Sequence, residues 1–150
     1  MESQRVALAH KWFKANETFD VDRVMALITG DFTVSVLPAS LGFPAVPRAH
    51  LPRALESVKS KLRGGKNKKE LLRIIDAPDA SGGGGTIVVH ARSVDTFMTD
   101  GTPYLNEYMI TIIMKSEGER LLISHVTEFA DSACIQAASS VQHALSVDHQ

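Results

Sequence analysis

The fold is decided by the stretch Thr86-Ile-Val-Val-His-Ala-Arg-Ser-Val-Asp-Thr-Phe-Met98, then Tyr104-Leu-Asn-Glu-Tyr-Met-Ile-Thr-Ile-Ile-Met-Lys115, then Leu121-Leu-Ile-Ser-His-Val-Thr-Glu-Phe129. All three segments are rich in β-branched and aromatic side chains, which favour strands. Asp100-Gly101 separates the first two segments and Glu117-Gly118 the last two, and both pairs are typical of turns between antiparallel strands. The stretch therefore predicts three consecutive antiparallel strands.

The flanking regions add helices and two further strands. Apolar residues at three- and four-residue steps predict a helix over 3–16 and another that starts near Leu51 and ends at Gly64-Gly65. Asp20 is a good N-cap for a short helix that ends at Gly30. Further predicted elements are strands over 32–37 and 71–77 and a C-terminal helix over about 131–146. This order indicates one α+β domain spanning residues 1–150. We expect a strongly bent, mainly antiparallel sheet, with helices on its concave face enclosing a blind cavity.

Composition excludes several classes of function. The 16 Lys and Arg residues nearly balance the 17 Asp and Glu residues, so the net charge of −1 gives no general attraction to nucleic acid or membrane. No apolar run approaches the length of a membrane span, and the N-terminus lacks the pattern of a signal peptide. The single Cys134 can form neither an internal disulfide nor a cysteine-rich zinc site. We therefore expect a cytoplasmic protein in a reducing compartment that binds no metal, nucleic acid or membrane.

A basic stretch runs from Lys59 to Arg73. It can be an anion or nucleic-acid patch, or a solvated helix end and loop. We favour the second interpretation, because no aromatic side chain is interleaved for base stacking.

Strand alternation places charged residues together on one face of the sheet. If the turns are centred near Asp100-Gly101 and Glu117-Gly118, Glu107 and Glu128 lie opposite each other with Arg92 close to both. Two facing carboxylates beside an arginine can shuttle a proton. The alternative is a salt bridge on the outer face or in a subunit contact. His90 shares this face and is either a catalyst or a hydrogen-bonded structural residue.

The other face combines polar and apolar side chains. Asn106 and Tyr108 alternate there with Ile110, and Phe129 joins them from the last strand. A few polar groups on an apolar wall are typical of a small-molecule pocket, in which Tyr and Asn can stabilise an enolate oxygen. Ordinary sheet packing is the alternative.

Two residues near the third helix, His50 and Glu56, can act as a base or belong to the helix surface. The chain has no spacing typical of a metal site and no Gly-x-Ser-x-Gly motif of serine hydrolases.

Four segments, Val89-His-Ala-Arg-Ser93, Asp100-Gly101, Tyr104-Leu-Asn-Glu-Tyr108 and Val126-Thr-Glu-Phe-Ala-Asp-Ser132, resemble fungal SnoaL-like proteins of the nuclear-transport-factor-2-like superfamily. Trp12 in the N-terminal helix, Asp31-Phe32 and the turn Leu37-Pro38-Ala39-Ser40-Leu41 match as well, so the resemblance covers about residues 3–138. It implies a cone-shaped α+β fold whose pocket opens between the concave sheet and the helices.

The resemblance also implies a function. Small fungal members of this family isomerise, cyclise or dehydrate hydrophobic carbonyl compounds of polyketide or meroterpenoid secondary metabolism, by acid–base chemistry and without metal or organic cofactor. The residues expected to be catalytic are His90, Asn106, Tyr108, Glu128 and His50. Those expected to contact the small hydrophobic substrate are Trp12, Leu37, Glu56, Arg92, Glu107 and Phe129.

Two alternatives belong to other functional classes. The chain can be a non-catalytic, dimeric small-molecule-binding protein of the same fold, or a dimeric interaction module that functions through its outer sheet face. We expect a homodimer in each case, because the predicted helices can cover only one face of the sheet, and monomers rarely expose large apolar patches.

Overall fold

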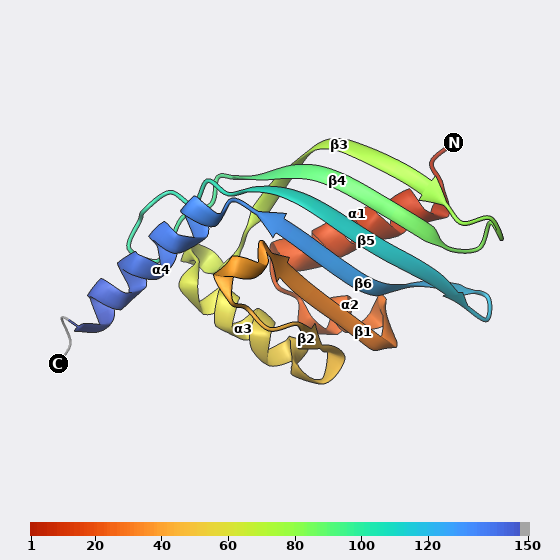
Figure 1. The fold of residues 1–150 in the computed structure, drawn as a ribbon. Coiled ribbons are helices and arrows are strands. Elements are labelled where there is room, and N and C mark those ends of the chain that lie inside the picture. The colour runs from red at the N-terminus through yellow and green to blue at the C-terminus, as the bar shows by residue number, and fades with distance from the viewer. Residues whose placement is uncertain (148–150) are drawn as a thin grey trace.

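The computed structural model describes the backbone of residues 1–147 and the side chains up to Ser139. Four helices lie against or beside one six-stranded sheet (Figure 1). The predicted C-terminal helix forms, and residues 148–150 of the predicted domain lie outside the described residues.

The helices begin where the sequence supplies caps. Helix α1 (Gln4–Glu17) starts after Ser3, whose hydroxyl accepts a hydrogen bond from the Val6 N–H at 3.1 Å. Helix α2 (Val21–Ala26) starts after Asp20, which accepts from the Arg23 N–H at 3.2 Å. Helix α3 spans Leu51–Lys61 and helix α4 spans Ser132–Val147.

Helix α2 corrects one predicted boundary. It ends at Ala26 and not at Gly30, because Ile28 already pairs with β6 as a strand residue. Pairing across the sheet therefore overrides the helical pattern of the sequence there.

The sheet is mixed, in the order β2-β1-β6-β5-β4-β3. Strands β3 to β6 form an antiparallel meander, whereas β1 pairs in parallel with β6. The strands are β1 (Ile28–Leu37), β2 (Val46–Pro47), β3 (Lys68–Pro78), β4 (Gly85–Val94), β5 (Glu107–Glu117) and β6 (Arg120–Ala130). The α+β class and the curved sheet with helices on one face are confirmed.

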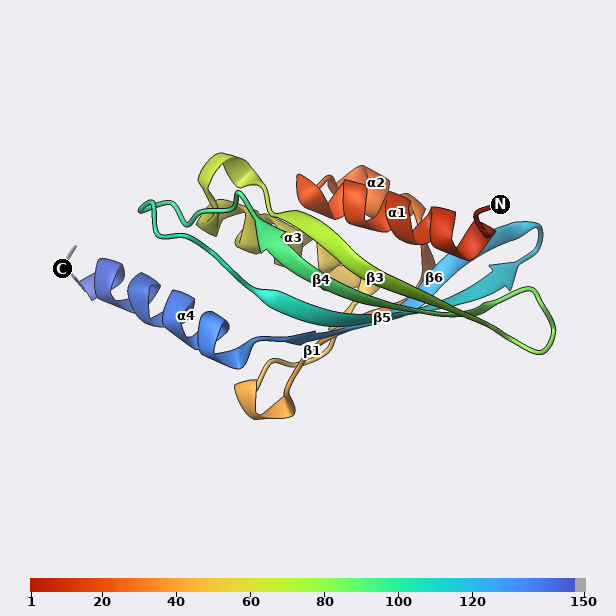
Figure 2. The same ribbon diagram turned by 90° about the horizontal axis from the view of Figure 1, so that it is seen from above.

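The inward face of the sheet is the one that α1, α2 and α3 cover (Figure 2). Trp12 of α1 packs against Phe32 of β1, with 5.7 Å between ring centroids. The fully buried residues of the inward face include Ile87, Val89, Ala91, Ile110, Ile112 and Val126. This core fills the space between the helices and the sheet.

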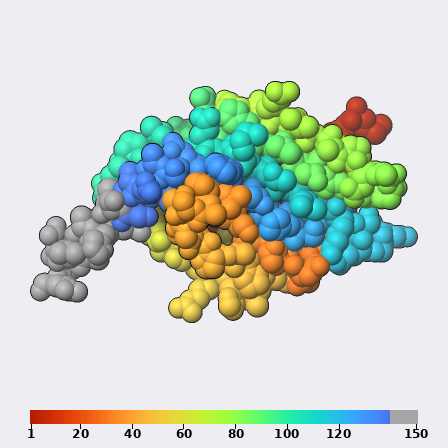
Figure 3. Space-filling view, viewed as in Figure 1, coloured from red at the N-terminus to blue at the C-terminus, as the bar shows by residue number. Residues whose placement is uncertain are grey.

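The outward face carries no helix across its centre. Figure 3 shows β3 to β6 at the surface, while the red atoms of the N-terminal end of the chain are visible only at one edge. Apolar side chains on it are half exposed: Ile75 at 44%, Met109 at 46%, Ile113 at 40% and Phe129 at 53%.

A bulge in β6 changes the predicted register. The pairing shifts between Ile113↔His125 and Met114↔Ile123, which leaves Ser124 as an extra residue on β6. One extra residue moves every later side chain to the opposite face. Glu128 is therefore aligned with inward-facing Ile110, and Phe129 with outward-facing Met109.

Candidate functional site

Three buried polar side chains on and beside the inward face form a closed hydrogen-bonded ring. The Ser93 hydroxyl donates to the Asn67 Oδ1 at 2.8 Å, and the Asn67 amide donates to the Tyr108 hydroxyl at 3.3 Å. Since the single Ser93 proton is used on Asn67, the 3.0 Å contact between the Tyr108 and Ser93 hydroxyls has Tyr108 as its donor. Burial raises the pKa of Tyr108. The Tyr108 proton is thus already taken by a protein acceptor.

The hydroxyl of a second tyrosine, Tyr104, accepts a hydrogen bond but does not donate one to any described residue. The Tyr104 oxygen accepts from the Asn106 amide at 2.8 Å, and the Asn106 Oδ1 accepts from the Asp131 N–H at 3.1 Å. Among the described residues, no hydrogen bond has Tyr104 as its donor. Burial raises the pKa of Tyr104, although the hydrogen bond from Asn106 partly opposes this. Tyr104 is therefore a neutral phenol with a proton to donate.

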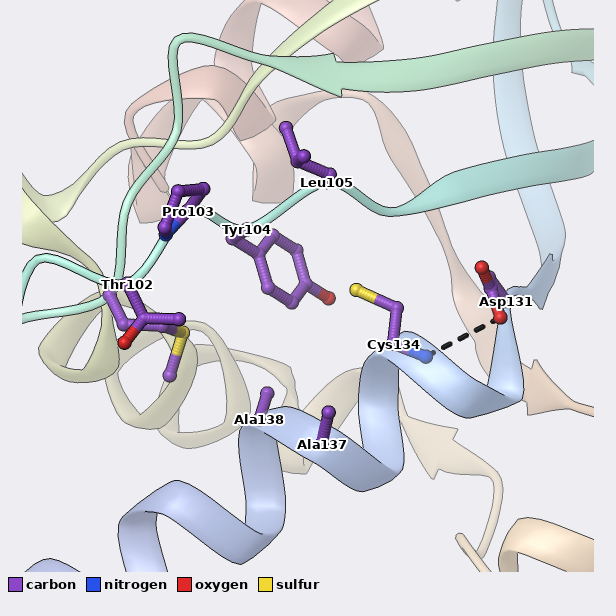
Figure 4. A pocket seen from close by; sticks show the side chains of 9 residues that line it. Thr102, Pro103, Tyr104, Leu105, Asp131, Cys134, Ala137 and Ala138 are labelled. Carbon is purple, nitrogen blue, oxygen red and sulfur yellow. Dashed lines mark hydrogen bonds between the residues drawn. The ribbon is translucent and has the colours of Figure 1, made fainter.

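Tyr104 also lines a pocket of about 270 Å³ (Figure 4). The pocket lies between the loop 98–105 and the first turns of α4, and the Tyr104 hydroxyl and the Cys134 thiol point toward each other there. The apolar residues of its wall are Met98, Pro103, Leu105, Ala137 and Ala138. The pocket thus lies under α4, not under α1–α3 as expected, and Tyr104, not Tyr108, forms its wall.

The pocket rim carries one carboxylate and one thiol. Asp131 Oδ1 accepts from the N–H groups of Ala133 and Cys134 at 3.0 and 3.4 Å, which fixes the carboxylate at the start of α4. Burial, followed by the neighbouring Asp131 charge, raises the pKa of the Cys134 thiol. The thiol is therefore neutral, and among the described residues of this wall the Asp131 carboxylate is the only charged group.

An amine lies near the tyrosines. Lys69 of β3 is opposite Ser93, and its Nζ is 5.2 Å from the centre of the Tyr108 ring. Burial lowers the pKa of Lys69, while the charges of Glu128 and Glu17 oppose that shift. The interpretation of the whole basic stretch as solvated is therefore wrong for this residue.

The predicted charge cluster of Arg92, Glu107 and Glu128 is divided between the faces. Arg92 and Glu107 are aligned on the outward face, but Arg92 donates to Glu70 at 2.7 Å. Glu107 instead contacts His90 at 2.7 Å. Glu128 lies on the opposite face because of the bulge in β6. The prediction that all three share one face is wrong.

The inward group is also only partly as predicted. Asn106 and Tyr108 are both buried. Phe129 is exposed on the outward face, because the bulge in β6 turns it outward just as it turns Glu128 inward.

The remaining candidate residues lie apart from the pocket. His50 and Glu56 are exposed, the first in a 3₁₀ turn before α3 and the second on α3. Trp12 is a core residue at 3% exposure, and Leu37 is half-buried at the end of β1 beside Phe129. None of these four side chains lines the pocket under α4.

Sequence reasoning missed Tyr104, Asp131 and Lys69 as site residues. The alternation that placed Asn106 and Tyr108 on one face also points to Tyr104, two residues earlier, if the strand pattern is extended into the loop. Lys69 lies between the exposed residues Lys68 and Glu70, so the sequence alone does not distinguish it from the charged residues around it.

A second pocket of about 520 Å³ lies between the turn Ala39–Leu41 and α4. Its described wall residues include Leu41, Phe43 and Ile135, and none of the described ones has a titratable side chain.

Among the described side chains, those of residues 1–139, no group of three or more His, Cys, Asp or Glu is arranged to hold a metal ion. In the same part of the chain, no helix is both long and apolar enough to span a bilayer.

No protein-family model and no curated protein matches this chain. Solved structures do: BvnE pinacolase from Penicillium brevicompactum has a TM-score of 0.77 at 24% identity, over 96% of this chain and 99% of that one. PrhC from Penicillium brasilianum has a TM-score of 0.75 at 20% identity, over 94% and 89% of the two chains. The hexachlorocyclohexane dehydrochlorinase LinA-type3 from Novosphingobium barchaimii reaches 0.68 at 9% identity, over 83% and 82%. The chain therefore has the nuclear-transport-factor-2-like, or SnoaL-like, fold that the sequence resemblance predicted.

Proposed function

We propose that this protein is a cofactor-independent acid–base isomerase, cyclase or dehydratase, acting on a small hydrophobic carbonyl compound of secondary metabolism. One observation carries the proposal: Tyr104 is a neutral phenol on the wall of an apolar pocket, and its oxygen accepts from Asn106 at 2.8 Å. Its proton has no acceptor among the described residues. The pinacolase and dehydrochlorinase of the same fold support an enzyme of this general kind.

Tyr104 is suited to stabilise a developing oxyanion. When a proton leaves the carbon beside a carbonyl, negative charge moves to the carbonyl oxygen. The Tyr104 O–H donates to that oxygen, and the Asn106 amide strengthens the donor by stabilising charge on the phenol oxygen. Asn106 thus keeps a role in the proposed mechanism, as a positioning residue for Tyr104.

The base in this proposal is Asp131. Its carboxylate lines the same pocket, and two backbone N–H groups hold it in place. Glu128, predicted as a catalytic residue, is a half-buried inward carboxylate whose negative charge raises the pKa of both Tyr104 and Tyr108. We assign it an electrostatic role. His90 and Glu107 lie on the other face of the sheet and have no part in the proposed chemistry.

A non-catalytic binding protein is the second candidate. It is favoured by the closed ring in which Tyr108 donates to Ser93, because a satisfied hydroxyl serves the fold rather than a reaction. Both candidates use the same apolar pocket.

Exchange of α-protons in D₂O distinguishes the acid–base enzyme from the binding protein without knowledge of the natural substrate. We expect the protein to accelerate exchange in small cyclic ketones such as 2-tetralone, followed by NMR. Tyr104→Phe should lower the rate by about 10²–10³, the usual effect of removing one oxyanion donor. Tyr108→Phe is the matched control and should change the rate much less. Ketone binding without exchange would favour the binding protein.

We also propose that a second copy of the chain covers the outward face. The exposed apolar residues Met109, Ile113 and Phe129 are flanked there by the oppositely charged pairs His90–Glu107 and Arg92–Glu70. A face with balanced charges around an apolar centre is complementary to itself under two-fold symmetry. Light scattering should give a dimer mass at micromolar concentration, and Met109→Asp should give a monomer. A monomeric mass for the unmodified protein would contradict this.

A further inference from the structure

The pocket under α4 continues the outward face of the sheet. Leu105 lines the pocket and lies two residues before Glu107 and four before Met109, so strand alternation places it on the outward side of β5. On the neighbouring strand, the Asp131 N–H donates to the Glu107 carbonyl oxygen at 3.0 Å, and Asp131 follows exposed Phe129 by two residues. Both strands thus lead from the apolar centre of the outward face to the pocket.

The pocket is also open on that side. Helix α4 leaves the sheet on the side away from α1 to α3 (Figure 2), and the blue atoms at its start lie beside the loop 98–105 on the surface shown in Figure 3. Leu105 is 69% exposed and Cys134 is half-buried, although both line the pocket. Small-molecule sites usually bury most of their ligand. In the single chain this pocket therefore has an incomplete wall.

A dimer interface on the outward face is large enough to reach the pocket. A stable interface buries roughly 800 Å² on each partner, which corresponds to a disc with a radius of about 16 Å. Since strand residues rise by about 3.4 Å each, Leu105 is about 14 Å from Met109 and Asp131 is about 7 Å from Phe129. An interface centred on Met109 and Phe129 therefore extends over the mouth of the pocket.

We propose that a second copy of the chain closes the pocket, so that each site is complete only in the dimer. This inference rests on the proposed function and on the proposed second copy, and it makes the partner subunit part of the site. The partner subunit covers Leu105 and excludes water from the space beside Tyr104 and Asp131. In a drier pocket, the hydrogen bond from the Tyr104 phenol to a developing oxyanion is stronger.

The Cys134 thiol reports whether the pocket is closed, because it is the single cysteine of the chain and lines the pocket wall. Its alkylation by excess N-ethylmaleimide is followed by intact mass, at protein concentrations from far below to far above the dissociation constant of the dimer. At about 100 times that constant, fewer than about a tenth of the chains are monomeric, so each chain should react at least about tenfold more slowly than at high dilution.

Ile113→Asp separates closure of the pocket from a local effect on the thiol. Ile113 is exposed on the outward face, but it lies about 27 Å from Leu105 along β5. We expect this variant to be monomeric and to react rapidly at every concentration. Val58→Asp is the matched control, because Val58 on α3 is 43% exposed against 40% for Ile113 and lies on the other side of the sheet. It should keep both the dimer and the slow reaction, and circular dichroism checks that both variants are folded.

A dimer in which Cys134 reacts as fast as in Ile113→Asp would overturn the proposal. Slow alkylation of monomeric Ile113→Asp would also overturn it, because the chain itself would then close the pocket. A protein that is monomeric at every concentration would overturn the proposal together with the proposed second copy. Failure of the proposed function gives a different result: Cys134 is protected in the dimer, but 2-tetralone exchanges no faster with the protein than without it.

Discussion

Both faces of the sheet carry polar groups, but the inward face and the outward face hold them in different ways. On the inward face, Ser93, Asn67 and Tyr108 satisfy one another in a closed ring, away from water. On the outward face, His90–Glu107 and Arg92–Glu70 are pairs with substantial solvent exposure. A buried polar group depends on its partner, whereas an exposed one can exchange its partner for water. Substitutions on the two faces should therefore differ in their effect on stability.

The largest effect is expected from Trp12→Ala. The indole is 3% exposed and packs on Phe32, so its removal leaves a cavity in the core and should lower the free energy of unfolding by about 3–5 kcal/mol. Denaturant unfolding measures the loss, and Lys11→Ala on the exposed side of α1 is the control. A small loss of stability with impaired ligand binding would instead support the original expectation that Trp12 contacts substrate.

Ser93→Ala tests the closed ring. The substitution leaves the buried Asn67 Oδ1 without its donor and the buried Tyr108 O–H without its acceptor, while the Asn67 amide still donates to Tyr108. We expect a loss of about 1–3 kcal/mol in unfolding free energy. Ser60→Ala on exposed α3 should be nearly neutral. Equal stability of the two variants would show that the ring contributes nothing.

The contact between α1 and β3 should be sensitive to acid. Arg5 and then Ser3 hydrogen-bond Asp76 and hold the pKa of its carboxyl below the usual value. As the pH falls, the unfolded chain therefore binds a proton at Asp76 before the folded chain does, near pH 3.9. The stabilisation is present above about pH 4 and is lost as the pH falls through the folded pKa.

Asp76→Asn should consequently be less stable than the unmodified protein near neutral pH, and the gap should narrow in acid. Urea unfolding at a series of pH values measures this difference. The exposed Asp22→Asn is the control. Parallel stability curves for the unmodified protein and Asp76→Asn would contradict the assigned contact.

The smallest effect is expected on the outward face. Arg92 and Glu70 are 53% and 45% exposed, so Arg92→Ala should cost less than about 1 kcal/mol despite the 2.7 Å contact. A loss of several kcal/mol would mean that the pair is buried, as it would be against a second subunit. Repeating the measurement at several protein concentrations separates these two cases.

Most elements of the fold could be predicted from the sequence because each has a local signal. Caps at Ser3 and Asp20 begin the first two helices, and the turns near Gly101 and Gly118 separate the strands. The β4–β5 alignment of Arg92 with Glu107 agrees with a turn centred near Asp100-Gly101. Position 124 has no such signal: nothing in the local sequence marks a bulge, and the side chains after it were assigned to the wrong face.

The candidate site was less predictable than the fold for a related reason. Tyr104 lies in a loop before β5, and its position on the pocket wall depends on the packing of α4, which begins 28 residues later in the chain. Lys69 has exposed neighbours on both sides, and only the distant contact with the Tyr108 ring distinguishes it from them. Both residues take their environment from segments far away in sequence.

The parallel pairing of β1 with β6 has a consequence for how the chain reaches its native state. The Thr33 hydroxyl and the His125 ring, which hydrogen-bond across this pair, are 92 residues apart in sequence. The meander of β3 to β6 can form from neighbouring segments, but β1 must close a long loop before it pairs with β6, and such non-local steps are slow. During synthesis, β1 therefore has the two-residue β2 as its pairing partner, and its other edge stays without β6 until almost the entire chain has been made. Chain growth itself thus creates an interval in which one edge of β1 is vulnerable to aggregation.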